Sequence, residues 1–150
     1  MIPPYYPQET DFSCAVACLR MVLAAYGVSK SEAELRGLCD CTIFGTAALE
    51  LIRVARGLGF TATRKYSLTL EDLRDFTVQG YFPIIYGVRA GDVHSWVITT
   101  VSEQTVEVLD PQFGERRLSL IAFSELWSPM KNLAVVVALP QDESLTLGNP

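Results

Sequence analysis

Apolar residues recur at helical spacing near the start of the chain. Between residues 14 and 26 they stand three or four positions apart, and a glycine follows: Ala15, Cys18, Leu19, Val22, Leu23 and Tyr26, then Gly27. This spacing predicts a helix that ends at the glycine. Alanines fill several of the remaining positions, so nearly the whole surface of this helix is apolar or small. We therefore expect it to be central and buried.

Shorter helices are expected after this one. The segment Ser31–Glu34 has the pattern of a capping box, which predicts a helix reaching about Leu38. A further helix is expected from Gly45 or Thr46 to Gly57, and another begins at Thr69. A single helical turn is expected near residues 123–127.

The second part of the chain has the alternation of strands. The expected strands are 60–66, 82–88, 94–101, 105–109, 116–120 and 133–139, with a hairpin turn at 102–104. Helices followed by an antiparallel sheet indicate the α+β class. This order places a cysteine at the start of the buried helix and a histidine at the start of a strand.

Composition and charge restrict the class of protein further. The chain has 150 residues, of which 49% are hydrophobic and 19% charged, which is typical of one globular domain. The net charge is -5 and no cluster of Lys and Arg occurs, so we expect no nucleic-acid partner. We expect the domain to span residues 1–140 and the polar segment 141–150 to be a flexible tail.

The apolar segments of the chain bear on its location. The first residues lack both the charged and the apolar region of a signal peptide. The longest apolar runs, such as 133–139, are too short to cross a bilayer. We therefore expect a cytoplasmic protein without a membrane-spanning segment. The sequence does not indicate an oligomeric state.

Four cysteines raise the question of disulfides or a metal. Cys39 and Cys41 are two residues apart and resemble half of a zinc site, but no second pair at ligand spacing accompanies them. Nothing else in the chain suggests a secreted protein, so disulfides are not expected. We interpret Cys39 and Cys41 as buried or loop thiols and expect neither a metal nor a cofactor.

Cys14 and His94 form a candidate catalytic pair. Cys14 begins the buried helix, where the helix dipole stabilises a thiolate. His94 is the only histidine, so it is the only candidate base. A cysteine and a histidine are the minimal machinery for acyl transfer, although either residue alone is more often structural.

The second nitrogen of the histidine ring needs a partner that orients it. Asp92 lies two residues before His94, but it belongs to a turn that we expect to be solvated. Asp110 ends the next predicted strand. If 94–101 and 105–110 pair as a hairpin, Asp110 lies beside His94, so we favour Asp110.

An oxyanion hole would complete the site. The backbone N–H of Cys14 is one candidate donor. The side-chain amide of Gln8, in the extended segment before the helix, is a second. The hypothesis rests on these residues occurring in the right order, each at the right end of its element.

Several short motifs between residues 5 and 128 share a pattern that is strong in combination. They are Gln8, Cys14 to Met21, Phe44 to Thr46, Gly57 to Phe60, Phe82 to Ile85, His94 to Ile98, and Asp110 to Gly114. In these motifs the chain resembles the papain-like peptidases that process bacteriocin precursors at double-glycine leaders, and their wider relatives.

The resemblance implies a papain-like fold in which Cys14, His94 and Asp110 form a triad and Gln8 lines the oxyanion hole. The chain departs from the family pattern at three positions. Ala15 replaces a usual glycine, Ser13 a frequent aspartate, and Ser95 a frequent aromatic or hydrophobic residue. In leader processing the domain is normally fused to a membrane transporter, and double-glycine specificity is therefore one possibility among others.

These observations favour one of three functions. The first is a cysteine endopeptidase that cleaves a peptide or protein substrate, after small residues or a double glycine. The second is an amidase or transpeptidase that uses the same triad, which the fold alone does not separate from the first. The third is a catalytically silent peptide-binding domain, which ranks last because the chain has both Cys14 and His94.

Overall fold

The computed structural model describes residues 2–140, which contain five α-helices, one 3-10 helix and a six-stranded sheet. The helices are α1 (Cys14–Ala25), α2 (Glu32–Leu38), α3 (Ala48–Gly57), α4 (Leu70–Val78), α5 (Leu120–Trp127) and η1 (Ser128–Met130). The strands are β1 (Thr61–Lys65), β2 (Ile84–Arg89), β3 (Asp92–Val101), β4 (Thr105–Asp110), β5 (Gly114–Ser119) and β6 (Ala134–Ala138). The predicted tail, 141–150, lies outside the described residues.

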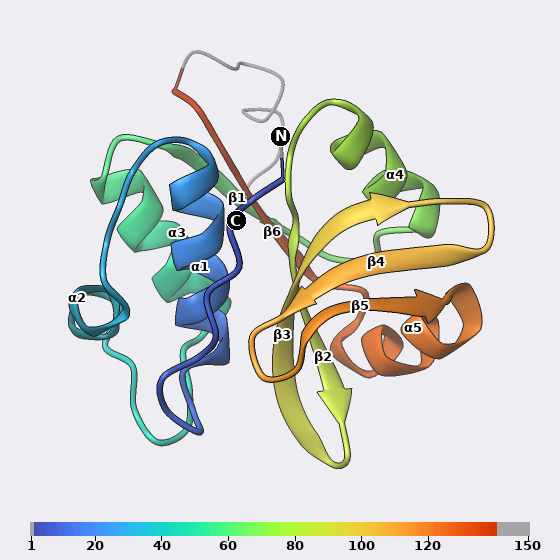
Figure 1. The fold of residues 1–150 in the computed structure, drawn as a ribbon, viewed down its shortest axis with the longest axis horizontal. Helices are drawn as coiled ribbons and strands as arrows, with labels where there is room; N and C mark the ends of the chain where they lie inside the picture. Colours follow the sequence, from blue (N-terminus) through green and yellow to red (C-terminus); the bar gives the residue numbers. More distant parts are fainter. Residues whose placement is uncertain (1, 141–150) are drawn as a thin grey trace.

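All strand pairs of the sheet are antiparallel, in the order β1-β6-β2-β3-β4-β5. The helices α1 and α3 cover one face with a large apolar core, and α4 and α5 cover the other with a second core built around Trp96 and Trp127. Figure 1 shows α1, α2 and α3 gathered on one side of the sheet. The prediction of an α+β fold with an antiparallel sheet is confirmed.

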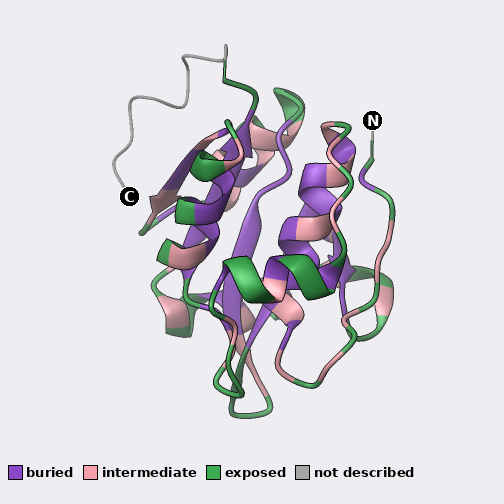
Figure 2. Ribbon diagram, turned by 90° about the vertical axis from the view of Figure 1, so that its left-hand side faces the viewer, coloured by how far each residue is buried: buried purple, intermediate pink, exposed green. Residues whose placement is uncertain are grey.

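The first helix is the most buried in the chain, as its apolar pattern predicts. Every residue of α1 is buried except Cys14, Arg20 and Ala24 (Figure 2). Because Cys14 stands at the first position, its side chain lies at the rim of the core. The sequence of α1 thus fixes the depth at which the thiol lies.

The short helices begin where their capping residues predict. Ser31 and Thr69 each accept a hydrogen bond from the third residue of the following helix, and both form complete capping boxes. Two boundaries differ from the prediction. The helix α3 begins at Ala48, two or three residues late, and α5 is a helix of eight residues where one turn was expected. Ser119 caps α5, a signal that the prediction did not use.

The hairpin of β3 and β4 contains a bulge that places the candidate residues. Ser102 and Thr105 close a tight turn, and pairing proceeds regularly to Thr100 opposite Glu107. The register then shifts at Thr99, so that Ile98 pairs with Val108. If Thr99 paired regularly with Val108 instead, every earlier residue of β3 would move by one position and turn to the opposite face of the sheet.

Gly87 of β2 allows α5 to approach the sheet closely. A Cβ atom at this position would lie 2.6 Å from the Leu126 carbonyl oxygen and 2.8 Å from the Trp96 ring. Gly87 pairs with His94 on the neighbouring strand. The absent side chain therefore makes room for Trp96 beside the histidine.

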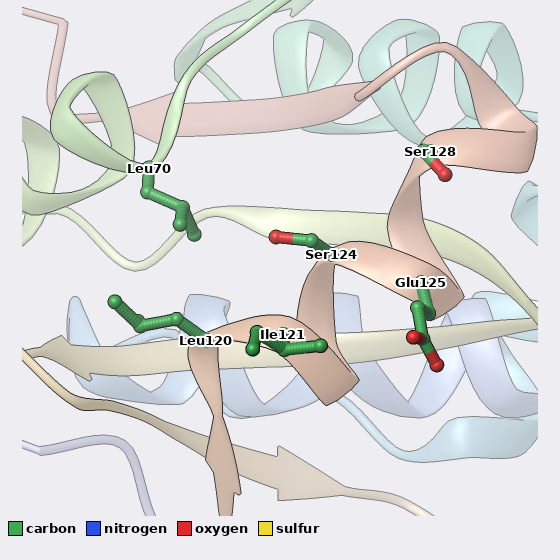
Figure 3. A pocket seen from close by; sticks show the side chains of 6 residues that line it. All are labelled: Leu70, Leu120, Ile121, Ser124, Glu125 and Ser128. Carbon is green, nitrogen blue, oxygen red and sulfur yellow. The ribbon is translucent and has the colours of Figure 1, made fainter.

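A shallow apolar hollow lies between α4 and α5, on the face opposite α1. Its lining residues are Leu70, Leu120, Ile121, Ser124, Glu125 and Ser128 (Figure 3). None of the candidate catalytic residues lines it. Among residues 2–140, no helix has both the length and the apolar character that a bilayer crossing needs.

Candidate active site

Cys14 lies where the first turn of α1 meets the start of β3. The preceding residue, Ser13, occupies the N-cap but makes no side-chain cap, so the first turn of α1 keeps free N–H groups near the sulfur. Burial acts to raise the pKa of the Cys14 thiol. A hydrogen bond and the charge of His94, with the backbone N–H groups of Ser95 and Ala15, outweigh burial and leave this pKa lowered.

His94 is buried and contacts a different partner with each side of its ring. Its Nε2 lies 3.0 Å from Oδ1 of Asp110. Its other nitrogen is thereby left for the hydrogen bond with the Cys14 thiol. Burial acts to lower the pKa of His94, but the bonds to Asp110 and Cys14 outweigh it, so that the pKa is raised.

Asp110 is fully buried and surrounded by donors. Besides His94, its carboxylate accepts hydrogen bonds from Trp96 Nε1 at 3.1 Å, from the Gln112 backbone N–H at 2.9 Å, and from the Arg89 guanidinium. Burial acts to raise the pKa of Asp110, and these donors together lower it far below its usual range. Asp110 is therefore ionised at neutral pH.

Asp92 lies away from the histidine ring. It is the first residue of β3, is exposed to solvent, and pairs through its backbone with Arg89. Within residues 2–140, no hydrogen bond or ion pair joins Asp92 to His94. The structure thus brings Cys14, His94 and Asp110 together and leaves Asp92 at the exposed start of β3.

Gln8 lies on the extended segment that precedes α1. Its backbone N–H donates to the Pro111 carbonyl at 2.8 Å, and its Nε2 donates to the Thr10 carbonyl at 2.7 Å. Its Oε1 is buried and has no hydrogen-bond partner among the described residues. Gln8 lines the same cleft as Cys14 and His94.

The cleft has apolar walls. On one side, Ile43 and Phe44 form the tip of a tight turn closed by Thr42 and Gly45, and Phe44 is 93% exposed. On the other side, the exposed side chains of Val93 and Phe113 line the cleft. Such exposed apolar side chains around a reactive thiol are suited to contact a ligand.

Arg89 is a site residue that the sequence analysis missed. Its guanidinium bonds Asp110 and Gln112, lies 3.1 Å from Nε2 of His94, and packs over the Phe113 ring at 4.7 Å. A signal for it was available. Ala90 and Gly91 both have positive φ, and a hairpin turning there places Arg89 diagonally across from His94.

The other cysteines lie in different environments. All four cysteines are within the described residues and are free thiols. Burial raises the pKa of Cys18 well above its usual value and that of Cys39 to about 12. Cys41 is partly exposed, with its sulfur 3.8 Å from the Phe12 carbonyl oxygen. No group of three metal-ligating side chains occurs among residues 2–140.

A buried helix that begins with a cysteine, packed against a sheet that carries a histidine and an aspartate, is the arrangement of papain-like cysteine peptidases. The particular family follows from comparison with known proteins. The sequence model of the Peptidase C39 family matches residues 3–139. The chain belongs to this family of cysteine peptidases.

Several characterised transporters contain a segment similar to this chain. The transport/processing ATP-binding protein ComA of Streptococcus pneumoniae (strain ATCC BAA-255 / R6) is 36% identical over 129 residues, which are 83% of this chain and 17% of that protein. An uncharacterized protein of Methanothermobacter marburgensis is 32% identical over 122 residues, 81% of this chain and 80% of that protein. The chain therefore corresponds to a small part of the transporters and to most of the archaeal protein.

Solved structures show the same fold. The peptidase domain of Streptococcus ComA, a bi-functional ABC transporter, superposes with a TM-score of 0.79 at 26% identity, covering 89% of this chain and 96% of that domain. A double glycine motif protease from an AMS/PCAT transporter, solved in complex with its leader peptide, gives 0.77 at 22% identity, covering 91% of each chain. The predicted resemblance to this family is confirmed.

Proposed function

We propose that this chain is a cysteine endopeptidase in which Cys14 is the nucleophile, His94 the base, Asp110 the orienting carboxylate and Gln8 an oxyanion donor. One observation carries the proposal. The Cys14 thiol contacts the His94 ring, and the ring contacts Asp110. Cys14 and His94 both line an open cleft. The lowered pKa of the thiol and the raised pKa of the neighbouring imidazole both favour the ionised pair that nucleophilic attack requires.

In the first half of the reaction, the Cys14 thiolate attacks the carbonyl carbon of the scissile peptide bond. The His94 imidazolium then gives its proton to the leaving amine, and a thioester of Cys14 forms as the C–N bond breaks. Asp110 keeps the His94 ring in the orientation that presents its proton-carrying nitrogen to the sulfur.

In the second half, water attacks the thioester. His94, now neutral, takes a proton from the water, and the C–S bond breaks to release the acid and the Cys14 thiolate. In both halves a negative oxygen develops on the carbonyl. The Cys14 N–H and the Gln8 amide, which line one cleft, would donate to it.

For the substrate, we propose a peptide cleaved after small residues, with a double glycine as the first candidate. The support is the similarity to double glycine motif proteases and to transport/processing proteins. The chain spans only 17% of the length of such a transporter. That its substrate is also transported is therefore part of this proposal and does not follow from the fold. We further propose that residues 1–140 form the catalytic unit and that it acts in the cytoplasm.

The experiment compares wild type and Cys14→Ala on synthetic peptides that differ only in having Gly-Gly or Val-Val at a central position. Mass spectrometry of the products should show cleavage after Gly-Gly by the wild type alone. A reaction with added hydroxylamine distinguishes hydrolysis from acyl transfer, because the transferase alternative predicts mainly the hydroxamate even at low hydroxylamine. Binding without cleavage by both proteins would instead support the silent domain and refute the proposal.

A further inference from the structure

Glu32, the first residue of α2, is a fully buried carboxylate that points at the segment before Cys14. Its Oε1 accepts hydrogen bonds from the Glu9 backbone N–H at 2.9 Å and from the Ser13 hydroxyl at 3.1 Å. Both partners lie on the extended segment that joins Gln8 to α1. A helix otherwise remote from the reaction thus contacts the segment that carries two candidate catalytic residues.

The second oxygen of Glu32 is poorly satisfied. Its Oε2 lies 3.2 Å from Nε of Arg36 in an ion pair, but the geometry is not that of a hydrogen bond, and neither atom has a hydrogen-bond partner among the described residues. Burying a charge with incomplete partners is costly, and apolar replacements of buried ion pairs are often neutral or stabilising. A gain in folding stability is therefore a weak explanation for a buried glutamate at position 32.

A line of hydrogen bonds connects Glu32 to the oxyanion donors. The Ser13 hydroxyl, which donates to Glu32, also accepts from the Thr10 backbone N–H at 3.1 Å. The Thr10 carbonyl in turn accepts from Gln8 Nε2 at 2.7 Å. Ser13 is also the residue directly before Cys14. The Glu32 carboxylate thus fixes, through the Ser13 hydroxyl, the segment between Gln8 and Cys14.

We propose that Glu32 is a positioning residue that holds residues 9–13 so that the Gln8 amide and the Cys14 N–H face the same carbonyl oxygen. This inference rests on the proposed function. The carboxylate comes from α2 and acts on the segment directly at the Glu9 backbone and through the Ser13 hydroxyl.

The decisive variant is Glu32→Leu, measured for kcat, KM and melting temperature on the cleaved peptide. The loss of the buried acceptor is expected to lower the melting temperature in either case, so activity is measured at a temperature where both proteins are folded. A purely structural glutamate predicts full kcat under these conditions. A positioning role predicts a kcat about tenfold lower with KM nearly unchanged, a smaller loss than the about 10²–10³-fold of a direct oxyanion donor. The rate at which iodoacetamide alkylates Cys14 should also be unchanged, since alkylation develops no oxyanion.

A second variant covers the case in which Glu32→Leu does not fold. Ser13→Ala removes the hydroxyl between Glu32 and Thr10, and because Ser13 makes no side-chain cap, this change removes no cap from α1. Because the buried hydroxyl also bonds Glu32 and Thr10, some loss of stability is expected, and kcat is compared at a temperature where both proteins are folded. There it should be lowered in the same way. The matched control is Glu34→Gln, an exposed carboxylate on the same helix, which should match the wild type.

The outcomes separate this inference from the proposed function. A wild type that cleaves no peptide contradicts the proposed function itself. A wild type that cleaves, together with full kcat in Glu32→Leu or in Ser13→Ala, overturns the role of Glu32. Loss of Cys14 alkylation in step with kcat would also overturn it, because the thiol and not the oxyanion hole would then be disturbed.

Discussion

At the scale of single residues, His94 determines how the thiols of the chain differ. It contacts Cys14 and no other cysteine, whereas burial makes Cys18 and Cys39 poor thiolates. We predict that iodoacetamide at mildly acidic pH alkylates Cys14 before the other three cysteines, as peptide mapping would measure. His94→Ala should slow this alkylation, because the thiolate loses its counterion.

Cys41 is the informative internal control for this measurement. It is partly exposed, as Cys14 is, but among residues 2–140 its sulfur bonds to backbone carbonyls and not to the histidine. Equal rates at Cys14 and Cys41, unaffected by His94→Ala, would show that exposure and not the histidine governs reactivity. The assignment of the nucleophile would then be wrong.

The two aspartates near the histidine predict different pH profiles. Asp110 stabilises the imidazolium of His94, and the imidazolium stabilises the Cys14 thiolate. Asp110→Asn should therefore move the alkylation profile of Cys14 to higher pH. Arg89 should enlarge this shift, because its cation remains beside the ring when the carboxylate is gone.

Asp92→Asn is the matched control, since this exposed carboxylate makes no contact with the ring among the described residues. Its profile should coincide with that of the wild type. The prediction is that the pH profile shifts more in Asp110→Asn than in Asp92→Asn. It specifies no size for the shift, because a cysteine nucleophile depends less on its base than a serine does. A larger shift in Asp92→Asn would reverse the assignment of the orienting residue.

At the scale of elements, the turn 42–45 presents two apolar side chains to the cleft. Covering a large apolar side chain completely contributes about 1.5–3 kcal/mol, so a bound peptide that covers only part of Phe44 would lose about tenfold in affinity without it. We predict that Phe44→Ser raises KM by about tenfold and leaves kcat nearly unchanged. Steady-state kinetics on the peptide of the proposed function measures both constants.

Val78→Ser is the control for the effect of removing an exposed apolar side chain. Val78 is 80% exposed at the end of α4 and does not line the cleft. Its KM should equal that of the wild type. An unchanged KM in Phe44→Ser, or an equal rise in both variants, would remove the turn from the substrate-binding surface.

The elements themselves follow from local sequence to a large extent. The helix at 14–25 was predicted from its apolar spacing, and the helices after Ser31 and Thr69 from side chains that cap their first turns. These signals act between residues that are close in the sequence, so they can be recognised without knowing the fold. The start of α3 was less accurate because no side chain caps this helix at Ala47, and the start of α5 because the cap at Ser119 was not used.

The contacts around the candidate site were only partly predictable. The hairpin placed Asp110 near His94, but it assumed a three-residue turn, whereas the structure has a tighter turn and a bulge at Thr99. The tighter turn shifts the pairing of the two strands by one residue, and the bulge shifts it back. Asp110 therefore still lies near His94. Arg89 was missed because the turn at Ala90 and Gly91 was not used to align it with His94. Glu32 was missed because its contacts depend on which buried atoms it meets in the folded chain, and no local pattern encodes that.

At the scale of the whole molecule, Asp110 links the sheet to the N-terminal segment as well as to the histidine. Its backbone carbonyl accepts a hydrogen bond from the Tyr5 hydroxyl at 2.8 Å, and its side chain binds Arg89 and Trp96. Because its pKa in the folded state is strongly lowered, its contribution to stability is present above its unfolded pKa of about 3.9 and is lost as pH falls toward the folded pKa.

This linkage predicts how the advantage of wild type over Asp110→Asn depends on pH. At pH 7 the wild type should be more stable by about 1–3 kcal/mol, the usual value of hydrogen bonds to a charged group. At pH 3 the difference should shrink, because the unfolded carboxyl takes up a proton that the folded one does not. Urea unfolding of both proteins at the two pH values measures it. A constant difference would contradict an ionised Asp110 in the folded protein.

The bulge at Thr99 has a consequence for how such proteins diverge. The segment of chain between His94 and Asp110 includes Thr99, which has no partner on the other strand of the hairpin. Losing that one codon would straighten β3 and leave Ile98 opposite Val108 as before. Descendants of a common ancestor can therefore differ by one in the spacing of these two residues and keep the same geometry. A search pattern written with a fixed interval between histidine and aspartate would overlook them.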